Sequence, residues 1–415
     1  MSSPGPAPTL RSGAPARARR RVVITGLGAL SCCGVGATEL FAGLLAPAPP
    51  GERRVAGFEP GAWFNPKEQR RTDRFAQLSL AAASMALEDA GELHTLPERT
   101  GVIFGTGVGG LGTLQEQISQ LLEKGPRRVS PFLVPMMMGN AGAAAISMRF
   151  GLRGPCQTVV TACASGTHAI SDAFRLVAFG TCDAMVTGGA EAPMDAVGDK
   201  PAIGVVAFSQ MTALSTSGIS RPFDVRRDGF VIAEGAGALV LEELGHALER
   251  GAHVYAEMLG SASTADAYHI TAPAPEGQGA RACMELALAD AGIGTGQVAL
   301  INAHGTSTPL NDLAEALAIE KVFGESAPPL TSNKGVTGHS LGAAGALEAV
   351  ASCLSIERGI IPPTAGLEQL DPEIHLDVVT GAPRALLPGA VLSNSFGFGG
   401  HNGCLVLAPL GDTPS

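Results

Sequence analysis

Aromatic side chains are scarce in this sequence of 415 residues: they make up 4% of it, with one Trp and two Tyr. Large rings therefore cannot build the core, and the 55 glycines predict an interior of small residues packed closely together. Because 45% of the residues are hydrophobic, the chain can still bury a large core, in one big domain or in two closely joined halves.

Positive charge is also lacking, since the formal net charge is −10 at pH 7. This balance argues against a nucleic acid as the partner, and an acidic protein could dock only through local groups of Lys and Arg. No apolar run reaches the roughly 18 residues of a membrane span. We therefore expect no membrane span and no nucleic-acid partner.

The eight cysteines have neither zinc-ligand spacing nor the pattern of a secreted disulfide framework. They are scattered, mostly within apolar segments, at positions 32, 33, 156, 163, 182, 283, 353 and 404. We expect no metal, no cofactor and a reducing compartment, which favours a cytoplasmic location.

Residues 1–20 are rich in Pro, Ala and Arg and contain no apolar segment like that of a secretory signal. We expect them to form a disordered N-terminal extension. An organellar transit peptide, which would also be Arg-rich and poor in acidic residues, is the alternative.

Apolar, β-branched segments alternate with amphipathic segments along the rest of the chain. Strands are expected at residues 21–29, 102–104, 159–160, 183–189, 235–241, 298–302, 390–393 and 404–407. Helices are expected at residues 73–91, 113–124, 169–177, 279–291, 310–323 and 345–358. This alternation predicts an α/β protein with largely parallel sheets.

The two halves of this pattern resemble one another. Each contains a strand, a loop of small residues and an Ala-rich helix, as in TACASGTHAISDAF from Thr161 and GVTGHSLGAAGALEA from Gly335. The weak internal symmetry predicts a duplicated fold, with halves over residues 21–250 and 251–411 and a site between them.

A glycine pattern near residue 105 needs separate interpretation. Gly105, Gly107 and Gly110 match the G-x-G-x-x-G of dinucleotide-binding loops. No acidic residue ends a second strand about 20 positions later, as ribose recognition requires. We interpret the pattern as a tight turn between a strand and a helix.

Cys163 is a candidate nucleophile. It lies in Thr-Ala-Cys-Ala-Ser-Gly, after the β-branched Val159 and Val160 and before residues with helical spacing. We expect a short buried strand, then a sharp turn that puts the thiol near the positive end of a helix. That position lowers a thiol's pKa from about 8.5 toward neutrality and makes the thiolate accessible.

Two histidines lie on loops of small residues. His304 follows an apolar strand, and in the next helix Thr308 is the expected N-cap and Pro309 the first residue. His339 lies in SNKGVTGHSLG together with Lys334. Two such histidines beside a candidate thiol favour catalysis over a structural role.

Five stretches, in order, resemble the β-ketoacyl-acyl-carrier-protein synthases, the condensing enzymes of fatty-acid and polyketide synthesis. They are TACASG, RPFDVRRDGFVIAEGAG, NAHGTSTPLND, SNKGVTGHSLGAAGALEA and SNSFGFGGHN. The type II elongating branch is the most similar, because initiating synthases have Asn in place of His339 and chain-length factors lack the cysteine. The resemblance implies the thiolase fold, with α/β/α/β/α layers and two similar halves.

The resemblance also implies a reaction, the decarboxylative condensation of an acyl-enzyme thioester with a malonyl thioester. Cys163 would carry the acyl chain, and His304 and His339 would stabilise the enolate formed as carbon dioxide leaves. Such hydrogen-bond donors in a dry pocket are typically worth about 2.7–4 kcal/mol each. Lys334 and Glu348 would hold the histidines in a charged network.

Other roles follow from the same resemblance. The backbone N–H groups of Cys163 and Phe398 would form an oxyanion hole, and the ring of Phe398 would gate access. Val108 would line the floor of the acyl tunnel. The remaining candidates for substrate binding are Phe208, Thr306, Thr308 and Gly399.

The implied partner is an acyl carrier protein, loaded with an acyl or a malonyl group. Its expected docking residues are the basic side chains Lys67, Arg70, Arg71, Arg127 and Arg128. Because family members dimerise through the segment around residues 131–135, we expect a homodimer or a heterodimer with a chain-length-factor-like subunit. The chain departs from the family at CCGVG from Cys32, where Ser-Pro-Leu-Gly is usual, and at His401, where Thr is common.

Four alternatives stay open. The chain could be the ketosynthase subunit of a type II polyketide synthase, a non-catalytic subunit, or a thiolase with Cys404 as its second cysteine. It could also be a serine acyl hydrolase, because Ser340 lies in a G-x-S-x-G pattern with later Asp371, Asp377 and His401. The polar segment before Ser340 argues against the hydrolase, which needs a buried strand there.

Overall fold

The computed structural model describes residues 19–49 and 53–411, so residues 1–18 of the expected extension lie outside the described part. Arg19 and Arg20, which belong to the expected extension, contact the folded body. The Arg19 guanidinium donates to the Leu259 carbonyl at 2.8 Å, and Arg20 forms an ion pair with Asp183. The folded body thus includes residues that precede the predicted start at residue 21.

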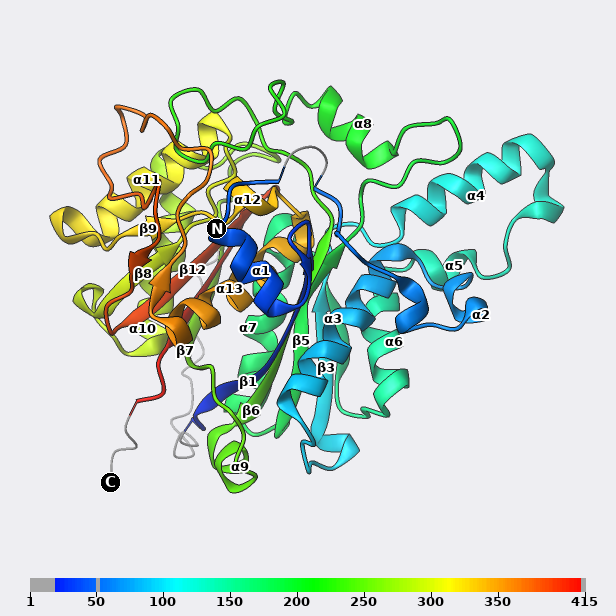
Figure 1. Ribbon diagram of the computed structural model, residues 1–415, viewed down its shortest axis with the longest axis horizontal. Helices are drawn as coiled ribbons and strands as arrows, with labels where there is room; N and C mark the ends of the chain where they lie inside the picture. Colours follow the sequence, from blue (N-terminus) through cyan, green and yellow to red (C-terminus); the bar gives the residue numbers. More distant parts are fainter. Residues whose placement is uncertain (1–18, 50–52, 412–415) are drawn as a thin grey trace, which may run out of the picture.

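Over the described residues, the main sheet has eleven strands, in the order β4-β3-β5-β6-β1-β7-β13-β12-β8-β9, with β2 paired to β1 (Figure 1). β10 and β11 form a separate pair. The bounds are β1 Val22–Ser31, β2 Gly34–Val35, β3 Thr100–Gly105, β4 Cys156–Val159, β5 Ala184–Glu191, β6 Gly235–Glu243, β7 Ala256–Ala265, β8 Val298–Asn302, β9 Leu330–Thr331, β10 Ile360–Ile361, β11 Arg384–Ala385, β12 Ala390–Gly397 and β13 His401–Ala408.

Each half of the sheet repeats one strand order. The first half consists of β1, β3, β4, β5 and β6, and the second of β7, β8, β9, β12 and β13. When the strands of each half are numbered in chain order, the third strand lies at the edge of the sheet in both halves. The second, fourth, fifth and first strands follow it toward the centre. The halves meet where β1 pairs antiparallel with β7, with Ile24 opposite Ala256. The repeat confirms a duplicated α/β fold, and we infer that its halves divide near residue 250.

Helices complete the layers. Their bounds are α1 Ala37–Leu44, α2 Pro66–Gln69, α3 Arg74–Ala90, α4 Leu111–Lys124, α5 Leu133–Met137, α6 Ala141–Phe150, α7 Ser165–Ala178, α8 Ile203–Gln210, α9 Leu244–Glu249, α10 Gln278–Ala291, α11 Pro309–Phe323, α12 Lys334–Thr337 and α13 Ala344–Arg358. α7 and α13 pack together and contact strands of both halves, whereas α3 and α6 contact the first half and α10 the second. The α/β/α/β/α arrangement is thereby confirmed, with α7 and α13 in the middle (Figure 1).

Small residues let these layers approach closely, as the composition predicted. A Cβ at Gly28 of β1 would lie 2.0 Å from the Ala82 carbonyl oxygen of α3, so only glycine fits there. α3 begins as expected, because the Asp73 side chain accepts the N–H of Phe75 at 3.0 Å. The scarcity of aromatics thus fits a core in which backbone packs against backbone.

Two local predictions have different outcomes. β3 ends at Gly105 and α4 starts at Leu111, which confirms the glycine pattern as a strand-to-helix turn. Within the single chain, the strand before Cys163 is not buried as predicted: β4 lies at the edge of the sheet, and Val160 is 57% exposed. An edge strand has a neighbour on one side, so a β-branched sequence does not ensure its burial.

Candidate active site

The candidate nucleophile lies on a strained turn. Ala162, Cys163 and Ala164 form a short 3-10 helix between β4 and α7, and Ala162 has a φ of 50°, in the left-handed region that non-glycine residues rarely adopt. Cys163 is buried and lies at the N-terminal end of α7. The predicted position of the thiol at a strand-to-helix turn is therefore confirmed.

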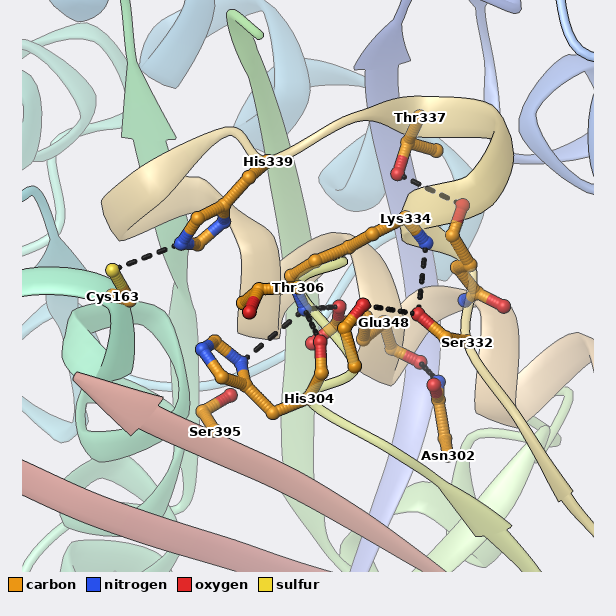
Figure 2. A network of polar contacts seen from close by, with 12 residues as sticks. Cys163, Asn302, His304, Thr306, Ser332, Lys334, Thr337, His339, Glu348 and Ser395 are labelled. Atoms are coloured by element: carbon orange, nitrogen blue, oxygen red, sulfur yellow. Dashed lines mark hydrogen bonds and ion pairs between the residues drawn. The ribbon is translucent and has the colours of Figure 1, made fainter. Parts of the chain in front are cut away.

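Two histidines from the second half face this thiol (Figure 2). His339 Nε2 lies 2.9 Å from Cys163 Sγ, and the His304 ring is 5.4 Å from the His339 ring, centroid to centroid. One ligand atom from each of the three residues lies within 4.8 Å of the others, the only such group of three found among the described residues. The site thus joins residues from both halves and offers one sulfur and two nitrogens to a substrate or to a metal ion.

The thiol is not the preformed thiolate that the sequence predicted. Burial raises the pKa of Cys163 to about 12, although the charge of Lys334 and the N–H of Phe398 oppose this. Burial likewise lowers the pKa of His304 and of His339 well below 6.5, and the positive charge of Lys334 adds to the effect. The prediction from the helix end did not include this cost of desolvation. A neutral His339 can accept the thiol proton through Nε2.

A buried lysine fixes the protonation of His304 (Figure 2). Lys334 Nζ pairs with Glu348, donates to the His304 carbonyl at 2.6 Å and lies 3.3 Å from His304 Nδ1. An ammonium group only donates, so His304 Nδ1 must accept and its proton resides on Nε2. Burial raises the pKa of Glu348 to about 7, which the Lys334 charge opposes. The network thus makes His304 Nε2–H a hydrogen-bond donor at the site.

Two buried carboxylates, which the sequence analysis missed, hold the loops of the site. Glu315 of α11 accepts the N–H groups of His304 and Gly305, each at 2.8 Å. Glu191, at the end of β5, accepts the N–H groups of Gly107 at 2.5 Å and of Gly342 at 3.1 Å. An acidic residue at the end of an otherwise apolar strand was the available signal for Glu191.

A cavity of about 600 Å³ opens beside these residues. Four of the predicted site residues line it with Cys163 and the histidines: Phe208, Thr306, Thr308 and Phe398. The ring centroids of Phe398 and Phe208 lie 6.4 Å apart, so Phe398, the predicted gate, lies beside a second aromatic ring that lines the cavity. Thr308 is the N-cap residue of α11, but its hydroxyl contacts that of Thr306 at 2.8 Å and does not cap the helix.

The backbone around Phe398 fits the predicted oxyanion hole. The N–H groups of Phe398 and of Cys163 both interact with the sulfur and lower the pKa of the thiol. A Cβ at Gly397 would lie 3.1 Å from the Cys163 nitrogen, so glycine lets the two segments approach. Gly399 has a φ of 82° and donates its N–H to the Ile270 carbonyl, outside the cavity lining.

Val108 does not line this cavity. Its side chain is 50% exposed at the turn after β3, and its N–H lies 3.3 Å from Glu191 Oε1. A role at the floor of an acyl tunnel therefore stays a prediction.

The predicted docking residues are exposed. Lys67, Arg70 and Arg71 lie at α2 and just after it, and Arg127 and Arg128 lie in a 3-10 helix after α4. The Arg71 guanidinium stacks 4.1 Å from the centroid of Phe132, which follows Arg128 closely in the chain. The two basic groups thus belong to one region of the first half, to the right in Figure 1.

The geometry does not support the hydrolase or the thiolase. Ser340 follows α12 and Gly338, so the strand required before a nucleophile elbow is missing. Asp371 pairs with Arg227, and Asp377 pairs with Arg384. Cys404 is fully buried within β13 and does not line the cavity.

A thiol with two neutral histidines on a duplicated α/β fold defines a condensing enzyme of the thiolase type. The chain matches the model of the beta-ketoacyl synthase N-terminal domain over residues 51–247 and that of the C-terminal domain over residues 255–368. It therefore belongs to the β-ketoacyl synthase family and is an acyltransferase. Among the described residues, no helix has the length and apolar character needed to cross a membrane.

Relatives extend along almost the whole chain. A 3-oxoacyl-[acyl-carrier-protein] synthase 2 from Synechocystis is 44% identical, over 92% of this chain and 97% of the relative, and one from Rhizobium meliloti is 44% identical, over 94% and 98%. The ishigamide ketosynthase/chain length factor structure has a TM-score of 0.88 at 37% identity, covering 95% of this chain and 100% of that one. A β-ketoacyl synthase from Burkholderia phymatum has a TM-score of 0.86 at 34% identity, covering 94% and 100%.

Proposed function

We propose that this chain elongates an acyl chain by two carbons, condensing an acyl group on Cys163 with a malonyl group held on an acyl carrier protein. The observation that carries the proposal is the contact of 2.9 Å between Cys163 Sγ and His339 Nε2, with His304 beside them. The similarity to 3-oxoacyl-[acyl-carrier-protein] synthases at 44% identity supports the same reaction.

The first step loads the enzyme. The Cys163 thiol gives its proton to His339 Nε2, and the sulfur attacks the thioester carbonyl of the acyl carrier. The N–H groups of Cys163 and Phe398 stabilise the oxyanion that forms on the carbonyl oxygen. When the intermediate collapses, the carrier's sulfur takes the proton and leaves, and the acyl group stays on Cys163.

The second step forms the carbon–carbon bond. The bond between the malonyl carboxylate and its α-carbon breaks, carbon dioxide leaves, and the electron pair forms an enolate. His304 Nε2–H and His339 Nε2–H donate to the enolate oxygen. The α-carbon then attacks the acyl carbonyl, and the Cys163 sulfur leaves as a thiolate, which takes up one proton from solvent. The product is a β-ketoacyl group on the carrier.

The two histidines differ in a way that suits these two steps. His304 Nδ1 faces Lys334, so its tautomer is fixed and Nε2 always donates. His339 Nδ1 is buried and has no hydrogen-bond partner in the described part of the chain. His339 can therefore take either neutral tautomer, accepting the thiol proton in the first step and donating in the second.

Fatty-acid elongation is the pathway that the relatives favour. The relatives at 44% identity are named 3-oxoacyl-[acyl-carrier-protein] synthase 2, whereas a structure of a type II polyketide synthase acyl-carrier protein in complex with its ketosynthase is 31% identical, with a TM-score of 0.85. A polyketide ketosynthase with a chain-length-factor partner is the second candidate, supported by the ishigamide structure at 37% identity.

An acyl carrier protein is the proposed macromolecular partner. Carrier proteins are acidic, so an acidic enzyme needs a local basic surface to bind one. Lys67, Arg70, Arg71, Arg127 and Arg128 supply such a surface, and none of them forms an ion pair with another described residue.

We also propose that two chains pair through the first half. The edge strand β4 leaves one row of backbone groups unpaired within the described chain. Large apolar side chains near it are exposed, among them Val134, Met148, Phe150 and Val160. Val160→Asp should give monomers in light scattering, whereas Leu286→Asp, which changes an exposed apolar side chain on α10 of the second half, should not. A monomeric wild type would contradict this proposal.

The reaction is tested by trapping the acyl group. The enzyme is incubated with an acyl carrier and without a malonyl donor, digested and analysed by mass spectrometry. We expect the acyl mass on the peptide that contains Cys163, and none in Cys163→Ala. Loss of the exposed thiol in Cys156→Ala should change nothing. Acylation of any other residue would reject the assignment.

The eight unpaired cysteines also support our proposal of a reducing, cytoplasmic location.

A further inference from the structure

Two adjacent cysteines, Cys32 and Cys33, take no part in the proposed reaction. β1 and β2 pair antiparallel with Ser31 opposite Gly34, so the two cysteines form the two-residue turn of a tight hairpin. The turn places the two side chains on adjacent residues, close enough for each thiol to change the pKa of the other. The hairpin thus presents a vicinal dithiol.

The two cysteines are partly exposed, and the sulfur of Cys33 packs against α1. Both cysteines are half-buried, so the turn that carries them is partly open to solvent. A Cβ at Gly43 of α1 would lie 2.4 Å from Cys33 Sγ, so the glycine makes room for that sulfur. The Cys33 N–H donates to the Ser31 hydroxyl at 3.1 Å, which orders the turn.

The thiols of Cys33 and Cys163 differ in their affinity for protons. The neighbouring Cys32 thiol lowers the pKa of Cys33 to about 7, and Ser31 and the positive charge of Arg53 act in the same direction against burial. Burial raises the pKa of Cys163 to about 12. At neutral pH, Cys33 is therefore the thiol with more thiolate, and thiolate is the form that reacts with electrophiles.

The dithiol also touches the active-site scaffold. Cys32 Sγ lies 3.6 Å from the carbonyl oxygen of Val336, within sulfur hydrogen-bond range. Val336 belongs to α12, the short helix that begins with Lys334. A chemical change at Cys32 therefore alters a contact with Val336, two residues along the chain from Lys334, which lies beside His304.

We propose that Cys32 and Cys33 are a second reactive thiol site, which takes two-electron oxidants of the peroxide class and closes to a disulfide. The Cys33 thiolate attacks one peroxide oxygen, the O–O bond breaks, and Cys33 becomes a sulfenic acid as water leaves. The Cys32 sulfur then attacks the Cys33 sulfur, and its proton leaves with the hydroxyl as a second water. Two thiols are oxidised and one hydrogen peroxide is reduced to two waters. Closure withdraws the Cys32 S–H from Val336, and we expect kcat to fall about threefold through the loss of that one contact.

Mass spectrometry tests the site without reference to the catalysed reaction. The full chain is treated with stoichiometric hydrogen peroxide, alkylated with iodoacetamide and digested. We expect the peptide with both cysteines to lose two hydrogens and to take no alkyl group, while Cys163 is not oxidised. Cys33→Ser should abolish the change. Cys32→Ser should stop at a sulfenic acid that dimedone captures, and Cys156→Ser should behave as wild type. Oxidation of Cys163 before this pair, or a pair that stays reduced, would overturn the proposal.

A second probe tests the pairing of the two sulfurs. Phenylarsine oxide binds stably where two thiols close a ring on arsenic, so wild type should bind one arsenic per chain at this hairpin and either single Ser variant should lose it. The threefold fall in kcat after peroxide should reverse with dithiothreitol. It should be absent in the double variant Cys32→Ser/Cys33→Ser, whose thermal stability is measured in parallel. Equal peroxide inhibition of wild type and the double variant would contradict the link to α12.

Discussion

The two halves of this molecule share a frame but not a chemistry. In the first, a 3-10 turn at Ala162–Ala164 leads into α7, and in the second a 3-10 turn at Leu341–Ala343 leads into α13. Both turns begin with a strained residue, with φ of 50° at Ala162 and 48° at Leu341. Cys163 occupies the middle of the first turn and Gly342 the middle of the second.

Packing explains why the second turn carries no nucleophile. A Cβ at Gly342 would lie 2.3 Å from the Gly107 nitrogen, because the loop after β3 of the first half packs against this turn. The loops after the second strand of each half are also held alike: Glu191 binds N–H groups of Gly107 and Val108, and Glu315 those of His304 and Gly305. The residues whose N–H groups are bound in this way include His304 in the second half, but only Gly107 and Val108 in the first. The duplicated fold thus supplies the proposed nucleophile from one half and the proposed hydrogen-bond donors from the other.

The largest expected effect concerns the turn that carries the nucleophile. Cys163→Ala should lower condensation by about a thousandfold or more, because no thioester can form. Release of carbon dioxide from the malonyl carrier should persist, since both histidines remain. Product formation and carbon dioxide are measured separately, with Cys156→Ala as the control. Normal turnover in Cys163→Ala would remove the basis of the comparison between the halves.

The two histidines of the second half should separate the two steps. Loss of one donor to the enolate should slow carbon dioxide release by about 10²–10³ in His304→Ala and in His339→Ala. Acylation of Cys163 should keep its rate in His304→Ala but slow in His339→Ala, because His339 Nε2 lies 2.9 Å from the sulfur. Rapid-quench mass spectrometry measures acylation. Equal acylation rates in the two variants would show that His339 does not accept the thiol proton.

The carboxylates that hold the loops should give a pH-dependent stability. Burial raises the pKa of Glu315 to about 7 from its ordinary 4.5. Between these values the folded state keeps a proton that the unfolded chain has released, so this group lowers the free energy of unfolding as pH rises through that window. Glu315→Gln should remove this contribution, and should itself cost about 1–3 kcal/mol by leaving a backbone N–H without its acceptor.

Urea unfolding of wild type and Glu315→Gln from pH 4.5 to pH 8 measures the difference. Glu191→Gln should show the same direction, because burial also raises the pKa of Glu191. The exposed Glu285→Gln is the control. A difference between wild type and Glu315→Gln that does not vary with pH would mean that this carboxyl is ionised throughout.

The smallest expected effect concerns the basic surface of the first half. Arg127→Glu/Arg128→Glu should raise KM for the carrier about three- to tenfold and flatten its dependence on salt, mainly through slower association. Arg281→Glu/Arg384→Glu makes the same charge change in the second half and should leave KM unchanged. A KM that responds equally to both double variants would reflect net charge and not a docking site.

Local sequence patterns predicted much of this structure. The strand over Val298–Asn302 and the helix start at Pro309 were expected from apolar runs and from the chemistry of caps. The Cys163, His304 and His339 motifs were expected to form one site because the histidines lie on loops of small residues and because all three motifs resemble those of the condensing enzymes. The repeated TACASG-like and HSLGAAG-like stretches already indicated duplication.

Burial and proton affinity were decided only by the tertiary structure. The sequence predicted a buried strand before Cys163, but the sheet order puts β4 at an edge. It predicted a lowered thiol pKa from the helix end alone, but the packing of the second half desolvates the sulfur and raises its pKa to about 12. Spacing along a chain specifies which way a side chain points. Its solvent exposure depends on segments more than a hundred residues away, such as the loop of His339, which contacts Cys163 although the two residues are 176 positions apart in the sequence. For that reason the sequence was enough to propose which residues carry the chemistry, whereas their protonation states depend on the fold.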